Sequence, residues 1–142
     1  MGGGLGTDIG KRVSRPIREE EIVLSEGWAK RFAEEWIQAW NSHDLEQILF
    51  HYVEDFEMTT PFIAKSMNEP SGTIRGKRNV GAYWAKALAQ VPDFQFELLD
   101  VLLGVGSIII YYRGAFGELA AEVLFFDECK KVVRAVAHYH EI

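Results

Sequence analysis

The chain has 142 residues, of which 48% are hydrophobic and 13% aromatic, so it can bury the core of one compact domain. Its 15 basic and 21 acidic residues give a formal net charge of −6, which argues against binding to the phosphate backbone of nucleic acid. No apolar run is long enough to span a bilayer, since the best one, residues 98–103, is interrupted by Asp100.

Residues 1–22 are predicted to be a flexible leader, and residues 23–142 to form the domain. The leader is rich in glycine, lacks the apolar centre of a secretory signal, and carries the acidic triplet Glu19–Glu21 without any apolar period. The single cysteine, Cys129, excludes an intrachain disulfide. Together these features predict a reduced, cytoplasmic protein.

Three helices are expected in the first two thirds of the chain. The first begins near Ser25, a good N-cap residue, and its buried stripe is made of aromatic residues at four-residue spacing. These are Trp28, Phe32, Trp36 and Trp40. Asp44 is expected to cap a second helix, with Gln47 in the capping-box position three residues later. A third helix should start after Gly76 and end before Pro92.

The remaining segments alternate as half-buried strands do. The first strand places Phe56, Met58 and Thr60 on one face and leads into a polar loop that lasts until residue 76. Residues 107–113 and 118–126 form a hairpin, and the last pair of strands turns at residues 127–130. This order predicts the α+β class, with a curved antiparallel sheet wrapping about three helices.

Several kinds of chemistry lack their sequence signals. No paired cysteines or histidines stand at metal-ligand spacing, and no glycine-rich phosphate loop follows a strand. Ser71 lacks the strand-to-helix frame of a nucleophile elbow. We therefore expect no metal and no cofactor. Acid-base chemistry in a pocket stays open, since it needs only one or two displaced carboxyl groups.

The order of elements and a set of short motifs resemble the SnoaL-like and ketosteroid isomerase-like proteins of the nuclear transport factor 2-like superfamily. The motifs are Ala39-Trp40-Asn41 with His43-Asp44-Leu45, Tyr52 before Glu54-Asp55, Thr60-Pro61-Phe62, Arg75-Gly76-Lys77, Tyr83-Trp84 and the closing strands. The resemblance implies a cystatin-like cone around one apolar pocket. The ligand it implies is a small apolar molecule, carbonyl-bearing or polycyclic.

The same resemblance implies which side chains line the pocket. They lie on the inward stripes of the helices and of the first strand, which the family fold brings together above the sheet. The expected wall consists of Trp36, Trp40, Phe56, Met58, Thr60, Phe62, Tyr83 and Trp84.

Ketosteroid isomerases pair an aspartate base with an oxyanion-stabilising tyrosine and a protonated aspartate. By the resemblance, the base position falls on Thr60, the tyrosine position on Trp36 and the protonated aspartate on Glu122. Threonine cannot abstract a carbon-bound proton near neutral pH, and an indole N–H is only a weak donor. Steroid isomerisation by that mechanism is therefore not expected.

Glu122 is the remaining candidate catalytic residue. It interrupts an apolar strand, and period two places Ala120, Leu124 and Phe126 on its face. The carboxyl is either buried with a raised pKa, or solvated on an edge strand, or paired with Arg113 or another cation at a dimer interface. A buried acid favours a cofactor-independent isomerase, cyclase or hydratase. The missing base favours instead a non-catalytic ligand-binding or dimerisation module.

The strand over residues 107–113 predicts a homodimer. Ile108, Ile110 and Tyr112 occupy one face and Ile109 and Tyr111 the other, so both faces are apolar. One layer of helices can cover only one of them, and a large exposed apolar patch is typical of an interface. The expected partners are thus a small apolar molecule and a second copy of the chain, with no nucleic acid and no membrane.

Overall fold

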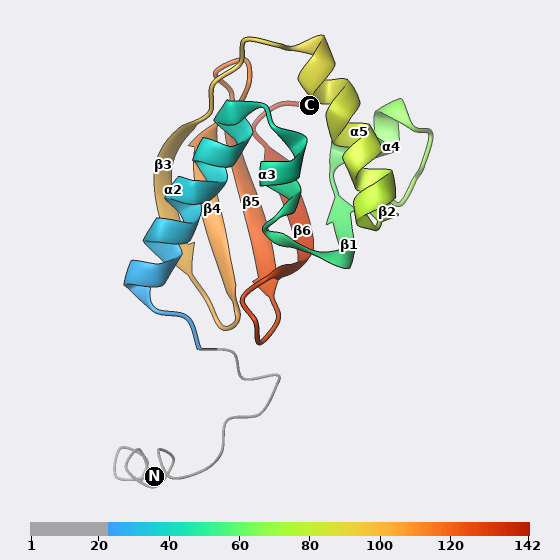
Figure 1. The fold of residues 1–142 in the computed structure, drawn as a ribbon. Coiled ribbons are helices and arrows are strands. Elements are labelled where there is room, and N and C mark those ends of the chain that lie inside the picture. The colour runs from blue at the N-terminus through green and yellow to red at the C-terminus, as the bar shows by residue number, and fades with distance from the viewer. Residues whose placement is uncertain (1–22) are drawn as a thin grey trace, which may run out of the picture.

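A curved sheet of six strands organises residues 23–142, the part of the chain that this computed structural model describes (Figure 1). The strands are β1 Tyr52–Thr59, β2 Thr73–Arg75, β3 Glu97–Leu103, β4 Ser107–Arg113, β5 Leu119–Phe126 and β6 Val132–Tyr139. They lie in the order β2-β1-β6-β5-β4-β3. The predicted α+β class is confirmed. The sheet is mixed rather than wholly antiparallel, because β1 pairs with β6 in parallel.

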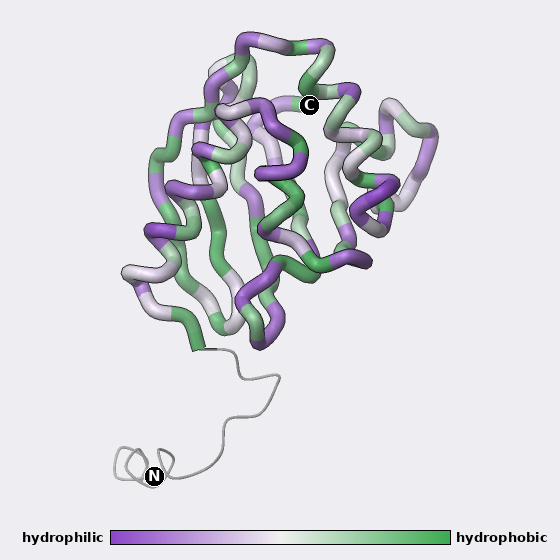
Figure 2. Tube along the Cα trace, in the orientation of Figure 1, coloured by the Kyte–Doolittle hydropathy of each residue, from purple (hydrophilic) through white to green (hydrophobic). Residues whose placement is uncertain are grey.

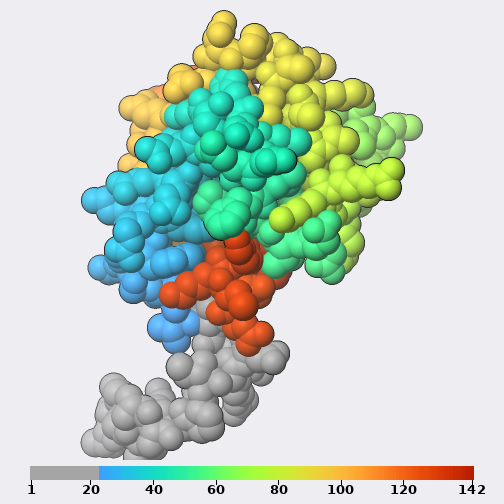
Figure 3. All heavy atoms as spheres, in the orientation of Figure 1, coloured from blue at the N-terminus to red at the C-terminus, as the bar shows by residue number. Residues whose placement is uncertain are grey.

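Helices cover one face of this sheet. They are α2 Glu26–Ser42, α3 Leu45–Leu49, α4 Pro61–Ser66 and α5 Lys77–Gln90. Helix α2 lies along β3, α5 lies beside β1, and α3 fits between α2 and α5 (Figure 1). Seen from this side in the space-filling view, the helices hide most of the sheet, and the turn between β5 and β6 emerges below them (Figure 3).

The predicted helix starts are confirmed. The Ser25 hydroxyl accepts a hydrogen bond from the Trp28 N–H at 3.1 Å, and the Asp44 carboxylate accepts one from the Glu46 N–H at 3.0 Å. These caps satisfy backbone donors that have no partner inside the helix. Helix α5 also begins directly after Gly76 and ends before Pro92, as predicted.

The loop expected between β1 and α5 is instead a short helix followed by a short strand. Thr60 caps α4, with its hydroxyl accepting from the Phe62 N–H at 3.3 Å, and Pro61 occupies the first helical position. Proline is favoured there because its missing N–H would be unpaired in any case. Strand β2 then pairs antiparallel with the end of β1. Six residues are too few to show a helical apolar stripe, which explains why the sequence pattern missed α4.

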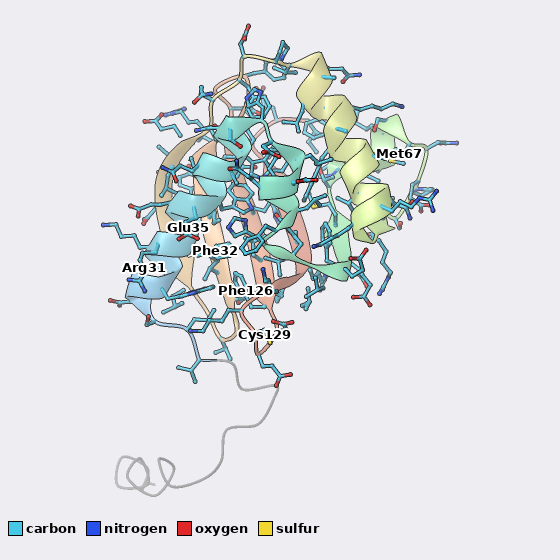
Figure 4. The ribbon with its side chains drawn as sticks, viewed as in Figure 1. Arg31, Phe32, Glu35, Met67, Phe126 and Cys129 are labelled. Carbon is cyan, nitrogen blue, oxygen red and sulfur yellow. The ribbon has the colours of Figure 1, made fainter. Side chains whose placement is uncertain are left out.

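Alternation along β4 and β5 decides which side chains enter the core. Ile108, Ile110 and Leu124 are fully buried beneath the helices. The strands accordingly carry long hydrophobic stretches, whereas hydrophilic residues recur along the helices that cover them (Figure 2). At the end of the core near the β5–β6 turn, Phe32 of α2 and Phe126 of β5 meet edge to face with ring centroids 5.0 Å apart (Figure 4).

A bulge in β3 breaks the alternation at one point. Leu98 lies opposite Tyr112, but the next paired residue is Asp100, which lies opposite Tyr111. The extra residue, Leu99, moves Asp100 to the outer face of the sheet, whereas strict alternation would place it on the inner face with Leu98.

The predicted leader, residues 1–22, lies outside the described residues. Among residues 23–142, no helix has the length and apolar character needed to cross a membrane.

Asn41 ties the end of α2 to the start of β3. Its side-chain N–H donates to the Phe96 carbonyl at 3.0 Å, and its side-chain oxygen accepts from the Phe96 N–H at 2.7 Å.

We expect Asn41→Ala to lower the unfolding free energy by about 1–3 kcal/mol, because two partly buried hydrogen bonds are lost. Urea denaturation measures the loss. Gln38→Ala, on an exposed turn of the same helix, is the control and should change stability by no more than about 0.5 kcal/mol. Equal losses in the two variants would contradict this role for Asn41.

Candidate functional site

An apolar cavity of about 210 Å³ lies between the helices and the end of the sheet that carries the β4–β5 turn. Its walls come from α2, β1, α5, the segment before β3, and strands β4 to β6. Seven of the eight side chains predicted for the wall line it. They are Trp36, Trp40, Met58, Thr60, Phe62, Tyr83 and Trp84.

Phe56 is the exception. Its side chain is fully buried and does not line the cavity. Its ring centroid lies 4.4 Å from that of Tyr52 and 5.7 Å from that of Trp84. Phe56 therefore supports the wall from behind and is not part of the cavity surface.

Other side chains in the wall were not predicted. Phe94 and Phe96 enter from the segment before β3, Tyr112 from β4 and Tyr139 from β6, and Phe116 enters from the turn between β4 and β5. The alternation of β4 could have identified Tyr112, because it shares the buried face of Ile108 and Ile110. Phe116 carries no such signal, since a turn has no period.

Glu122 points to the interior. It lies in the middle of β5, opposite Ile110 on β4 and Ala137 on β6, and only 3% of it is exposed. The Tyr112 hydroxyl donates a hydrogen bond to the Glu122 carboxyl at 3.2 Å. Strand β5 is not an edge strand, and Arg113 approaches Glu97 at 3.7 Å instead. The solvated-edge hypothesis is therefore wrong, and within one chain Arg113 does not pair with Glu122.

The burial of Glu122 sets its protonation. Desolvation raises the pKa of Glu122 to about 7, and the hydrogen bond from Tyr112 partly opposes this rise. Burial also raises the pKa of Tyr112 well above its ordinary value, and the neighbouring Glu122 carboxylate adds to that effect. Near neutral pH the site thus holds a neutral phenol beside a carboxyl group that is present in both its neutral and its ionised form.

Two tryptophans of the wall differ in their hydrogen bonding. The indole N–H of Trp36 donates to the Tyr52 hydroxyl at 2.9 Å, so it is already satisfied within the protein. The indole N–H of Trp40 is buried, and no acceptor among residues 23–142 reaches it. A buried donor without a partner is uncommon and costs free energy unless a ligand or water supplies an acceptor.

Thr60 supplies no base. It is 2% exposed, and its hydroxyl caps α4. Among residues 23–142, the carboxyl groups that line the cavity are those of Glu118 and Glu122. The Glu118 carboxylate accepts from the Phe116 N–H at 2.9 Å and thereby holds the β4–β5 turn. Within the same residues, no group of three or more histidine, cysteine, aspartate or glutamate side chains could hold a metal ion.

Comparison with known proteins identifies the family to which this architecture belongs. The sequence profile described as "SnoaL-like domain" matches residues 33–139. The chain belongs to the SnoaL-like domain family. A SnoaL-like protein of unknown function from Burkholderia thailandensis is 51% identical to it, with a TM-score of 0.80 over 81% of this chain and 96% of that one.

More distant structures share the fold of this SnoaL-like domain. A protein of unknown function with a cystatin-like fold from Methylobium petroleophilum is 15% identical, with a TM-score of 0.65 over 84% of this chain and 80% of that one. An NTF2-like protein of unknown function from Cytophaga hutchinsonii is 12% identical, with a TM-score of 0.60 over 78% and 88%. No curated protein shows significant similarity to the chain. The resemblance to the superfamily is confirmed, and the cone is the shared feature.

The raised pKa of Glu122 makes stability depend on pH. Between about pH 4.5 and pH 7 the unfolded chain releases this proton while the folded chain retains it, so the unfolding free energy falls as the pH rises. Glu122→Gln removes this term. We expect the variant to gain stability relative to the wild type, by roughly 3 kcal/mol between pH 4.5 and pH 8.

Urea denaturation at a series of pH values measures the difference. Glu128→Gln, an exposed change in the β5–β6 turn, is the matched control and should show no comparable trend. A Glu122→Gln difference that stays constant across the series would show that the Glu122 carboxyl titrates normally.

Proposed function

We propose that this SnoaL-like domain binds a small, largely apolar carbonyl compound and acts on it with Glu122 as a general acid. It would then be a cofactor-independent isomerase, cyclase or hydratase. The observation that carries the proposal is the solitary buried carboxyl in an aromatic cavity, bonded to the Tyr112 hydroxyl and with a pKa of about 7. A general acid works best when its pKa lies near the working pH.

The size of the cavity supports a ligand of about one ring. A dry cavity of about 150 Å³ can hold benzene, so 210 Å³ has room for a ring that carries a carbonyl group. A carbonyl oxygen seated there would accept from the protonated Glu122 carboxyl.

The chemical step follows from this donor. When a proton leaves the carbon next to the carbonyl group, the electron pair of that C–H bond forms a C=C double bond, and the π pair of the carbonyl group moves onto its oxygen. Glu122 gives its proton to this oxygen and forms an enol, and the reverse steps return a proton to carbon and to Glu122. A base from the solvent, hydroxide or the buffer, accepts the carbon-bound proton, since Thr60 cannot. General acid catalysis of this kind contributes about 10²–10⁴-fold.

The second candidate is a ligand-binding module without chemistry. The observation that favours it is Thr60, which stands where the resemblance puts the isomerase base and whose hydroxyl is committed to the cap of α4. In that case the neutral Glu122 and Tyr112 would only select a ligand with a polar group.

Acetophenone, an aromatic ring with a carbonyl group, is the probe that separates the two candidates. In D₂O at pH 6, ¹H NMR follows exchange of its methyl protons, and quenching of tryptophan fluorescence follows binding, because Trp36, Trp40 and Trp84 line the cavity. The proposal predicts exchange above the buffer rate in the wild type. Glu122→Gln should abolish this exchange with little change in affinity, since an amide keeps shape and polarity but cannot transfer a proton.

Tyr112→Phe is the companion variant. It removes the hydrogen bond that lowers the pKa of Glu122, so the pH at which exchange falls off should move upward while exchange itself persists. Binding without exchange in the wild type would sink the enzyme proposal and leave the binding module. Exchange that survives in Glu122→Gln would remove Glu122 from the mechanism.

We also propose that the outer face of the sheet forms a symmetric homodimer. A row of apolar residues crosses four strands there, because Leu102, Ile109, Val123 and Val136 lie opposite one another in register. Leu102 is half exposed, and no described helix covers this face (Figure 1). A continuous apolar patch of this kind is typical of an interface between copies.

Light scattering tests the dimer. We expect twice the mass of the chain at micromolar concentration, and the mass of one chain for Val123→Glu, which places a charge at the centre of the row. Val105→Glu, at a position 89% exposed in the turn before β4, should leave the dimer intact. A wild-type protein with the mass of one chain would refute the proposal.

A further inference from the structure

A second hollow adjoins the cavity. It is an open groove of about 900 Å³ between α4, β2 and α5. Phe62, Tyr83, Ala87 and Phe116 line both the groove and the cavity, so the two spaces meet at these side chains. Met67, at the end of α4, lies on the groove side of this junction beside α5 (Figure 4).

One face of α5 forms the floor of the groove. The residues that line it recur at the spacing of a single helix face. They are Asn79, Ala82, Tyr83, Lys86, Ala87 and Gln90. Helix α4 contributes Lys65 from the opposite side, so two ammonium groups border the same groove.

The charge of the groove differs from that of the chain. The chain carries a net charge of −6, yet among residues 23–142 no acidic residue lines the groove, and α5 contains none. Within residues 23–142, neither Lys65 nor Lys86 forms an ion pair. Two cations that no acidic side chain of the described residues pairs, at the open end of an apolar cavity, are complementary to one negative group on a ligand that fills the cavity.

We propose that the groove is a subsite for the carboxylate of the same ligand whose apolar, carbonyl-bearing end occupies the cavity. The natural ligand is then an amphipathic keto acid that spans both spaces, with its carboxylate held by Lys65 and Lys86. This rests on the proposed binding of a carbonyl compound in the cavity and is independent of whether Glu122 catalyses a reaction.

The size of the two spaces agrees with this assignment. The cavity of about 210 Å³ is smaller than the 300–1,000 Å³ usual for ligand pockets, and the groove of about 900 Å³ adds room for the rest of a longer ligand. The lysines also lie on the solvent side, where a carboxylate keeps part of its hydration. The carboxylate therefore avoids the desolvation that Glu122 experiences in the cavity.

A homologous series tests the subsite. The ligands are benzoyl alkanoates, C₆H₅–CO–(CH₂)n–COO⁻ with n from 2 to 5, each compared with its primary amide. Binding is followed by tryptophan fluorescence at pH 6, where the ligands are ionised and Glu122 is mostly neutral. We expect the acid to bind roughly 3- to 10-fold tighter than the amide once the linker reaches the groove, as partly exposed ion pairs contribute.

Two pairs of variants locate the effect. Lys65→Gln with Lys86→Gln should remove the preference for the acid and leave binding of the amide unchanged. Lys30→Gln with Arg31→Gln makes the same change in net charge on α2, away from both spaces, and should keep the preference. The preference should also shrink in high salt.

Each other outcome overturns the subsite. Acids that bind no better than amides, a preference that does not depend on linker length, or an equal loss in the control pair would all refute it. If neither series binds, the ligand-binding part of the proposed function fails as well. If the wild type prefers the acids but does not exchange the methyl protons of acetophenone, the subsite stands and only the catalytic proposal fails.

Discussion

The buried carboxyl of Glu122 is the constraint on which the rest of the site depends. A charged carboxylate at this depth would need a cation or several hydrogen bonds, and among residues 23–142 Glu122 has only the Tyr112 hydroxyl. The neutral acid is therefore the form that the fold favours below about pH 7. A neutral carboxyl group is a hydrogen-bond donor, so the cavity combines aromatic walls with one acid that can donate.

The sheet fixes the direction of this carboxyl. Strand β5 lies in the interior of the sheet, and its pairing with β4 and β6 holds Glu122 between Ile110 and Ala137. A slip of the pairing by one residue would send every side chain of β5 to the opposite face. Leu124 and Phe126 are buried on the same face as Glu122, and their burial opposes such a slip. The apolar residues thus stabilise the register that carries the acid inward.

Local sequence signals predicted the elements better than they predicted the site. Ser25 and Asp44 mark helix starts because capping depends on a few neighbouring residues, and period two alone places Glu122 with Leu124 and Phe126. The parallel pairing of β1 with β6 and the bulge at Leu99 depend on contacts between distant segments, so the sequence pattern could not reveal them. Phe56 shares a strand face with Met58, yet the packing of Tyr52 and Trp84 around its ring keeps it behind the cavity wall.

Thr60 combines two roles, because it caps α4 and also lines the cavity beside Glu122. An aspartate would cap α4 about as well as a threonine, so the cap alone does not explain why the base of the isomerases is missing here. Thr60 and Glu122 line the same small cavity, and a second carboxyl there would be desolvated and would repel the first. Threonine gives the helix its cap without that repulsion. Glu122 therefore has no second carboxyl group at the Thr60 position, and the other carboxyl group of the cavity wall, Glu118, is bonded to the Phe116 N–H in the β4–β5 turn.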